Sequence, residues 1–191
     1  MRSAIAVSVK PLLSSMLILA YCAVALPGAT LEQLSLDEMI IKASSIVRGK
    51  VLNSYTTSSG PVFYTHYRIE VSETLKGQER TSTEFQLPGG VVNNSRQSFA
   101  GVPEFKAGDE YVFFLWAGKD GRLQVLGLTQ GLFSVPGGVS ADPVITRSAS
   151  HEVMLERGTG RQVKDQTLAM NLSALRTRIA YLHGTVQAAA K

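Results

Sequence analysis

His66, Arg68 and Glu70 stand two residues apart from one another in the stretch YTHYRIEVSETLKG, residues 64–77. A histidine, a guanidinium and a carboxylate on one face of a strand can bind an anion or relay a proton. Opposite charges that pair across neighbouring strands on a solvated face produce the same pattern without any chemistry. The sequence favours the second interpretation, because polar strand faces carry chemistry less often than loops do.

Other patterns that would indicate catalysis or metal binding are missing from the sequence. The three histidines, His66, His151 and His183, do not pair at a spacing that would place two on one face of one element, and HExxH is absent. G-x-S-x-G, a P-loop lysine and a post-strand G-x-G-x-x-G are absent as well. We therefore expect no metal and no cofactor, and the sequence favours a protein that is not an enzyme.

Aromatic side chains near loops offer a stronger indication of binding. Tyr55, Tyr64 and Phe99 lie in or beside expected loops or on a polar strand face, where an amphipathic ring can anchor a partner. Packing of loops against the fold explains the same placement. The predicted ligand-binding residues are Tyr55, Tyr64, His66, Arg68, Asn94, Arg96 and Phe99.

The elements that would position these residues are mainly strands. Alternating apolar residues predict a half-buried antiparallel strand that starts near Phe63 and ends at Gly77. A strand over 46–55 precedes it, joined by the turn-forming TTSSGP, and TSTEFQLPGG adds a third strand that stops at Pro88. Before them, Ser35 and Glu38 have the spacing of a capping box and predict a helix over 36–43.

The middle of the chain combines one long loop with two further strands. Residues 89–108 are rich in Gly, Asn, Ser and Pro and lack a sustained period, which predicts a long loop of functional or disordered character. The apolar run 111–116 predicts a central strand buried on both faces. Residues 123–135 predict one more long strand, bent at Gly127 or Gly131.

The C-terminal part is expected to be irregular over 140–164 and helical over 165–184. Leu168, Leu172, Leu175, Ile179 and Leu182 form one helical stripe that would pack on the sheet, and Gly184 is placed as a C-cap. Residues from Arg147 onward carry more basic than acidic side chains. That balance fits either an anionic partner or a solvated helix face, and we favour the solvated face.

The N-terminal 29 residues have the composition of a secretory signal peptide. A basic start (Arg2, Lys10) precedes an apolar run over 12–26 that is shorter than a membrane span, with small residues in A-x-A spacing at Ala23 and Ala25. Removal would leave no cysteine, because Cys22 is the single one, and would lower the net charge from +4 to +2. We expect a secreted or periplasmic protein without disulfides or a remaining membrane span.

The segments SSIVRGKVLNS, YRIEVSETLKG, GVPEFKAGDEYVFFL and LGLTQGLFSV resemble secreted bacterial proteins of unassigned function. The first half also resembles netrin-like modules, the OB-type barrel of tissue inhibitors of metalloproteinases. That resemblance covers roughly residues 43–135 and implies binding of partners through loops at one end of the barrel. Metalloproteinase inhibitors use an N-terminal cysteine on the target's zinc, and the expected mature chain has no cysteine for that role.

Together these observations predict a mainly β protein: a five-stranded, antiparallel, partly open OB-like barrel over 30–139, with a short N-terminal helix and a C-terminal amphipathic helix packed on it. The expected function is a non-catalytic module that binds an extracellular or periplasmic protein or a small ligand. A cysteine-free protease inhibitor and a hydrolase with a dispersed site, using His66 or His151 as base, are the alternatives. Nucleic acid is not an expected partner, because aromatic and basic residues are not interleaved. The sequence predicts no particular oligomeric state.

Overall fold

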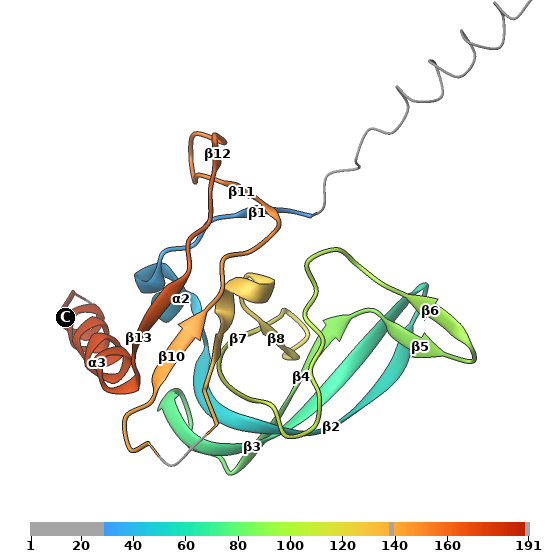
Figure 1. Cartoon of the computed structure of the whole chain (residues 1–191), viewed down its shortest axis with the longest axis horizontal. Helices are drawn as coiled ribbons and strands as arrows, with labels where there is room; N and C mark the ends of the chain where they lie inside the picture. Colours follow the sequence, from blue (N-terminus) through green and yellow to red (C-terminus); the bar gives the residue numbers. More distant parts are fainter. Residues whose placement is uncertain (1–28, 138–139, 190–191) are drawn as a thin grey trace, which may run out of the picture.

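The structure is a computed structural model that describes residues 29–137 and 140–189, with the side chains of 186–189 left out. The expected signal peptide over 1–29 falls, except for its last residue, outside the described residues. Over the described part the chain is mainly β, as expected, with two α-helices at opposite ends of the sequence (Figure 1). No helix within it is long and apolar enough to cross a membrane.

The first elements are a short strand, β1 (Thr30–Glu32), and a helix, α2 (Leu36–Lys42). The capping box predicted from the sequence is present: the Ser35 hydroxyl accepts from the Glu38 N–H at 3.2 Å, and Glu38 Oε2 accepts from the Ser35 N–H at 2.9 Å. Met39 and Ile40 are buried on the inner side of the helix. The helix therefore has both the local signal that starts it and the apolar side that docks it.

Two long antiparallel strands, β2 (Ser45–Ser59) and β3 (Val62–Lys76), form the largest hairpin of the molecule. They extend beyond the expected 46–55 strand, because Thr56 and Thr57 are β-branched and pair with Thr65 and Tyr64. The turn is reduced to Gly60 and Pro61, with Gly60 at φ 59. TTSSGP thus supplies the end of a strand as well as the turn.

The main sheet has the order β13-β10-β9-β7-β2-β3-β4, with β8 also paired to β7 (Figure 1). A second sheet has the order β1-β11-β12, and β5 pairs with β6. The bounds of the remaining strands are β4 (Ser82–Pro88), β5 (Gly90–Val92), β6 (Ser95–Gln97), β7 (Glu110–Ala117), β8 (Leu123–Val125), β9 (Leu132–Ser134), β10 (Val144–Arg147), β11 (Val153–Leu155), β12 (Gln162–Val163) and β13 (Leu168–Asn171).

The main sheet curls but is not closed by hydrogen bonds. Strand β8 lies against β4, yet the ladder of the sheet ends at β4 and no described strand pairs with its outer edge. The fold therefore has more strands than the five expected, and the expected barrel is represented here by a curled, open sheet.

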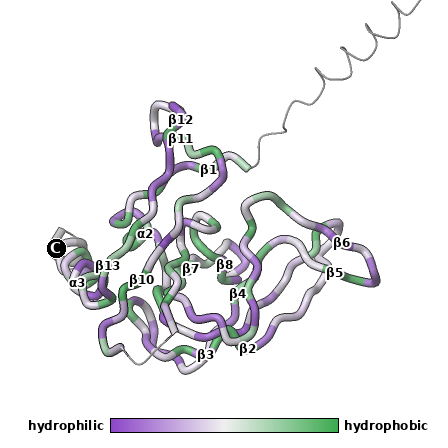
Figure 2. Tube along the Cα trace, in the orientation of Figure 1, coloured by the Kyte–Doolittle hydropathy of each residue, from purple (hydrophilic) through white to green (hydrophobic). Residues whose placement is uncertain are grey.

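Two apolar clusters form the core, one on each side of β7. The trace of the chain coloured by hydropathy is shown in Figure 2. Val112 and Phe114 belong to the cluster beneath the helices, whereas Phe113 and Leu115 belong to the cluster inside the curl of the sheet. Since consecutive strand residues face opposite sides, both sides of β7 must be covered. The expectation of a central strand buried on both faces is confirmed.

The segment 89–108 is more ordered than expected. Asn93 and Asn94, at φ 48 and 62, form a two-residue turn between β5 and β6, which is the backbone geometry of a tight hairpin. Farther along, the strand expected over 123–135 is divided: β8 ends at Val125, and a 3-10 turn η1 (Leu128–Gly131) precedes β9. Gly127 and Leu128, both at positive φ, make the break.

The C-terminal part departs most from expectation. The segment expected to be irregular contains β10, β11 and β12, and Leu168 lies in β13 rather than in the helix. The helix α3 (Leu172–Ala189) keeps the rest of the stripe, with Leu172, Leu175 and Ile179 in the cluster beneath the helices. It continues past Gly184, so this glycine is not a C-cap.

Candidate ligand-binding site

An open polar pocket of about 700 Å³ lies along β4. It extends from the start of β2 and the 80–82 loop to the turn between β7 and β8. The edge strand β4 contributes five consecutive lining residues, Ser82 to Gln86. The lining residues are Ser44, Ser45, His66, Arg80, Ser82, Thr83, Glu84, Phe85, Gln86, Ala117, Gly121, Arg122 and Leu123.

Glu84 is the centre of a cross-strand polar cluster beside this pocket. Register places Tyr55 of β2 opposite His66 of β3, and Arg68 of β3 opposite Glu84 of β4. The Tyr55 hydroxyl donates to Glu84 Oε1 at 2.8 Å, and His66 Nδ1 lies 3.3 Å from the same oxygen. Arg68 Nη2 lies 3.6 Å from Glu84 Oε2. The hydrogen bond to Glu84 raises the pKa of Tyr55.

His66 is held on three sides by this cluster. Its ring stacks on Tyr55 with centroids 4.7 Å apart and planes 5° from parallel. Its Nε2 lies 2.9 Å from Thr57 Oγ1, while Nδ1 faces Glu84. The imidazole side chain is only 15% exposed, so the polar row of β3 is less solvated at this position than the sequence indicated. Thr57, His66 and Glu84 thus form a hydroxyl–imidazole–carboxylate chain.

Two buried polar side chains lie at the floor of the pocket. Ser45 is 5% exposed and Gln86 is 4% exposed. Neither Ser45 Oγ nor Gln86 Oε1 has a hydrogen-bond partner among the described residues, although both atoms are shielded from solvent. An unpaired buried polar atom costs about 1–3 kcal/mol. These two residues therefore reduce stability where they stand.

Two exposed arginines give the pocket its positive charge. Arg80 follows the turn after β3, with Nη1 3.3 Å from the Thr83 hydroxyl, and Arg122 precedes β8, with Nε 3.5 Å from Asp120. The carboxylate of Glu84 faces Arg68 and His66 instead. The guanidinium groups retain donors for an anionic or hydroxylated ligand, since each carries five N–H groups.

The structure brings together three of the seven predicted site residues, Tyr55, His66 and Arg68, at Glu84. Tyr64 is half-buried on β3, opposite Thr57 and Pro88.

The remaining three predicted residues belong to the hairpin region. Asn94 is in the β5–β6 turn, and Arg96 and Phe99 line a different pocket of about 260 Å³ under the 89–104 segment. Arg96 pairs there with Glu104 at 3.1 Å. The predicted set therefore divides between two places.

Sequence reasoning missed Ser45, Arg80, Glu84, Gln86 and Arg122. For Glu84 and Gln86 a signal existed, because both lie on the polar side of TSTEFQLP. Only the register, which sets His66 beside Gln86 and Arg68 beside Glu84, shows that this side meets the polar row of β3. Within the described residues no group of three or more His, Cys, Asp or Glu side chains is placed to hold a metal ion.

Comparison of the chain with protein-family models, with curated proteins and with solved structures found no match.

Proposed function

We propose that this protein is a non-catalytic binding module that holds a small anionic ligand, a carboxylate or a phosphate, in the pocket along β4. The observation that carries the proposal is two buried polar atoms, Ser45 Oγ and Gln86 Oε1, which have no hydrogen-bond partner among the described residues and line the same pocket as Arg80 and Arg122. An apolar side chain at either floor position would give a more stable fold. Retention of costly polar groups is typical of sites that bind.

The ligand class follows from the charge of the lining. Arg80 and Arg122 line the pocket, and Arg122 also pairs with Asp120. The one carboxylate of the lining, Glu84, pairs with Arg68 and accepts a hydrogen bond from Tyr55, so Arg80 leaves the lining with an excess of positive charge. Guanidinium groups match the planar oxygens of carboxylates and phosphates. The serine and threonine hydroxyls of the lining can then donate to or accept from the rest of the ligand.

Titration with citrate and with inorganic phosphate, followed by calorimetry and by amide chemical shifts, tests this function. Arg80→Gln and Arg122→Gln should each weaken binding about tenfold. Arg96→Gln is the matched control, because Arg96 is an exposed arginine outside this pocket. Loss of affinity in the control equal to that in the pocket variants would show a non-specific charge effect, and no response to either anion would refute the function.

A second candidate function, ester or amide hydrolysis, is favoured by the Thr57–His66–Glu84 chain. Its hydroxyl, imidazole and carboxylate have the connectivity of a nucleophile, a base and an orienting acid. Hydrolysis of p-nitrophenyl acetate should then fall to background in Thr57→Val and persist in Thr56→Val, which alters the neighbouring threonine. Equal rates of hydrolysis in the two variants would rule out Thr57 as the nucleophile and reject this second function.

We propose further that the curled sheet is a netrin-like, OB-type barrel and that the protein works in the periplasm or outside the cell. Support for the barrel comes from five strands in the order β8-β7-β2-β3-β4, with β8 lying against β4. Support for export comes from the signal-like composition of residues 1–29. Fractionation of cells that express the full chain, with detection of the mature form outside the cytoplasm, tests the localisation.

A further inference from the structure

A further pocket, of about 450 Å³, lies between the 101–105 segment and the 148–152 segment. Its base is formed by β9 and by the aromatic rings of Phe105 and Tyr111, whose centroids are 5.3 Å apart. Val102 and Leu132 add apolar surface, and several serine and threonine hydroxyls lie around it. Because it shares no lining residue with the pocket along β4, its ligand need not be the same.

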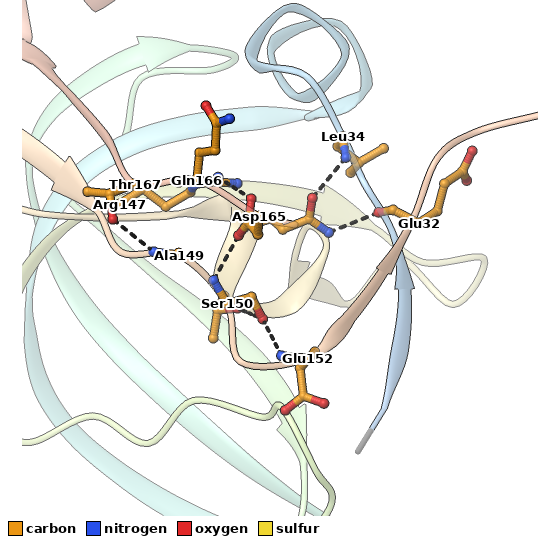
Figure 3. A network of polar contacts seen from close by, with 11 residues as sticks. Glu32, Leu34, Arg147, Ala149, Ser150, Glu152, Asp165, Gln166 and Thr167 are labelled. Carbon is orange, nitrogen blue, oxygen red and sulfur yellow. Dashed lines mark hydrogen bonds and ion pairs between the residues drawn. The ribbon is translucent and has the colours of Figure 1, made fainter. Parts of the chain in front are cut away.

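One wall of this pocket is fixed by a buried ion pair (Figure 3). Arg147 Nη2 lies 2.7 Å from Asp165 Oδ1, and both side chains are almost fully buried, at 4% and 1% exposure. Asp165 Oδ2 accepts from the Ser150 N–H at 2.8 Å. The buried pair thus anchors the backbone of the wall, which gives the site the support that precise recognition requires.

Side-chain hydroxyls complete the support of the same wall. Thr167 Oγ1 accepts from the Ala149 N–H at 3.3 Å, and Ser150 Oγ accepts from the Glu152 N–H at 3.1 Å. Figure 3 shows the Glu152 side chain leaving the segment on the side away from Asp165. Glu152 is therefore held in place by its backbone while its carboxylate stays outside the Arg147–Asp165 network.

Glu152 contributes a carboxylate to this pocket, next to His151, which also lines it. Its Oε2 is shielded from solvent and accepts no hydrogen bond within the described residues. The other carboxylate of the lining, Glu104, pairs with Arg96. Glu152 is half-buried, with one carboxylate oxygen shielded from solvent, and a shielded carboxylate oxygen is best satisfied by a cation close to it. The pocket consequently favours a ligand that brings a positive charge.

From this arrangement we propose that the pocket binds an organic ammonium compound: a protonated amine beside Glu152 and an apolar or aromatic portion against Phe105 and Tyr111. The Glu152 carboxylate lies against Gly101, at the start of the segment that carries Phe105, and Phe105, Tyr111 and Glu152 all line the same pocket. Aromatic faces also attract ammonium groups, which adds to the same preference. This proposal does not depend on the anion site along β4.

Titration of the full chain with phenethylammonium chloride and with its neutral analogue 2-phenylethanol tests the proposal through amide chemical shifts of residues 101–105 and 148–152. The ammonium compound should bind about tenfold more tightly than the alcohol. Glu152→Gln should remove that preference, whereas Glu104→Gln, a matched loss of one carboxylate at the same pocket, should retain it. Equal binding of the two compounds, an unchanged preference in Glu152→Gln, or no shift in these segments would overturn it.

The comparison of the two compounds on the unmodified protein keeps the test decisive if Glu152→Gln fails to fold. Arg80→Gln should leave phenethylammonium binding unchanged, because Arg80 lines only the β4 pocket of the two. A loss of ammonium binding in Arg80→Gln would also contradict the proposal, since it would place the cation at the wrong pocket.

Discussion

Two glutamines show how differently the same buried side chain can be used. Gln130 is 1% exposed and fully engaged: its Oε1 accepts from the Leu34 N–H at 2.8 Å, and its Nε2 donates to the Glu32 carbonyl at 3.0 Å. Gln86 is as deeply buried, yet its Oε1 has no partner among the described residues. The first glutamine holds β1 and the entry to α2 in place, whereas the second contributes to a pocket.

This contrast predicts stability changes of opposite sign. Gln86→Met removes an unpaired polar atom at nearly constant volume and should raise the free energy of unfolding by about 1 kcal/mol. Gln130→Met leaves the Leu34 N–H and the Glu32 carbonyl unpaired and should lower it by about 2–3 kcal/mol. Urea unfolding followed by circular dichroism measures both. Destabilisation of the same size in the two variants would mean that Gln86 has a structural partner.

The Gln86 variant also separates structure from binding. If the pocket along β4 is the anion site, Gln86→Met should weaken citrate binding while it stabilises the fold, because binding sites commonly retain groups that cost stability. If the variant is more stable and binds citrate as tightly as the parent protein, Gln86 does not contact the anion, and only Arg80 and Arg122 remain as its expected contacts.

At the scale of elements, a lysine of β3 caps the C-terminal end of α2. Lys76 Nζ donates to the carbonyls of Ile40 at 2.6 Å, Ile41 at 3.1 Å and Ala43 at 2.7 Å. A cation at a helix C-terminus meets the unpaired carbonyls and the negative end of the helix dipole. Partial burial lowers the pKa of Lys76, although three carbonyl acceptors surround the ammonium group. A residue 36 positions from Ile40 in sequence thus completes the helix.

Lys76→Met should therefore lower the free energy of unfolding by about 2 kcal/mol, since hydrogen bonds to a charged group contribute about 1.5–3 kcal/mol. Lys50→Met is the matched control: Lys50 is exposed on β2 of the same hairpin, opposite Glu70, and should change stability by about 0.5 kcal/mol or less. Thermal and urea unfolding measure the difference. Similar effects in the two variants would show that the cap contributes nothing.

Local signals in the sequence predicted the elements with complete short-range patterns. Ser35 and Glu38 determine the start of α2, and the apolar run through Phe113 and Phe114 indicates a strand covered on both sides. The Asn93–Asn94 turn of the β5–β6 hairpin also had a signal, two adjacent asparagines between strand-compatible residues, which the overall loop-like composition of 89–108 concealed.

Other elements depend on tertiary partners that no local pattern contains. Strand β10 has only four residues, and its place between β9 and β13 gives it partners on both edges. Leu168 continues the spacing of the α3 stripe, but it lies in β13, where it pairs with Arg147 of β10. The site was affected in the same way, because Glu84 becomes the centre of a cluster only when register brings Tyr55, His66 and Arg68 to it.

At the scale of the whole molecule, the basic C-terminal part is compensated from within. Arginines of this part pair with acidic residues of the described chain: Arg147 with Asp165, Arg157 with Glu32 and Glu38, Arg161 with Glu156, Arg176 with Glu73, and Arg178 with Asp37. Several of these pairs link α3 or the β11–β12 turn to the N-terminal elements. The arginines that make up most of the basic residues from Arg147 onward therefore have acidic partners within the described residues.

The same long-range pairing makes the docking of the two helices sensitive to acid. Asp142 accepts hydrogen bonds from the Ser173 hydroxyl, the Asn171 amide and the Ser173 N–H, the last of these in the first turn of α3. These hydrogen bonds lower the pKa of the Asp142 carboxyl. The hydrogen bond from Arg178 lowers the pKa of Asp37 in α2. A carboxylate with a lowered folded-state pKa stabilises the fold above its unfolded pKa of about 3.9 and loses that contribution as the pH falls through the folded value.

The protein should therefore keep constant stability near neutral pH and lose it below about pH 4. Asp142→Asn removes the titrating group at α3, so the variant should be less stable than the parent near neutral pH, and the difference should shrink as both are acidified. Asp120→Asn, at an exposed turn remote from α3 in sequence, should keep the acid response of the parent protein. Urea unfolding at several pH values, followed by helical circular dichroism, measures the difference. If it stays constant from neutral pH to about pH 3, the Asp142 carboxylate does not couple α3 to acid, and another titrating group governs the transition.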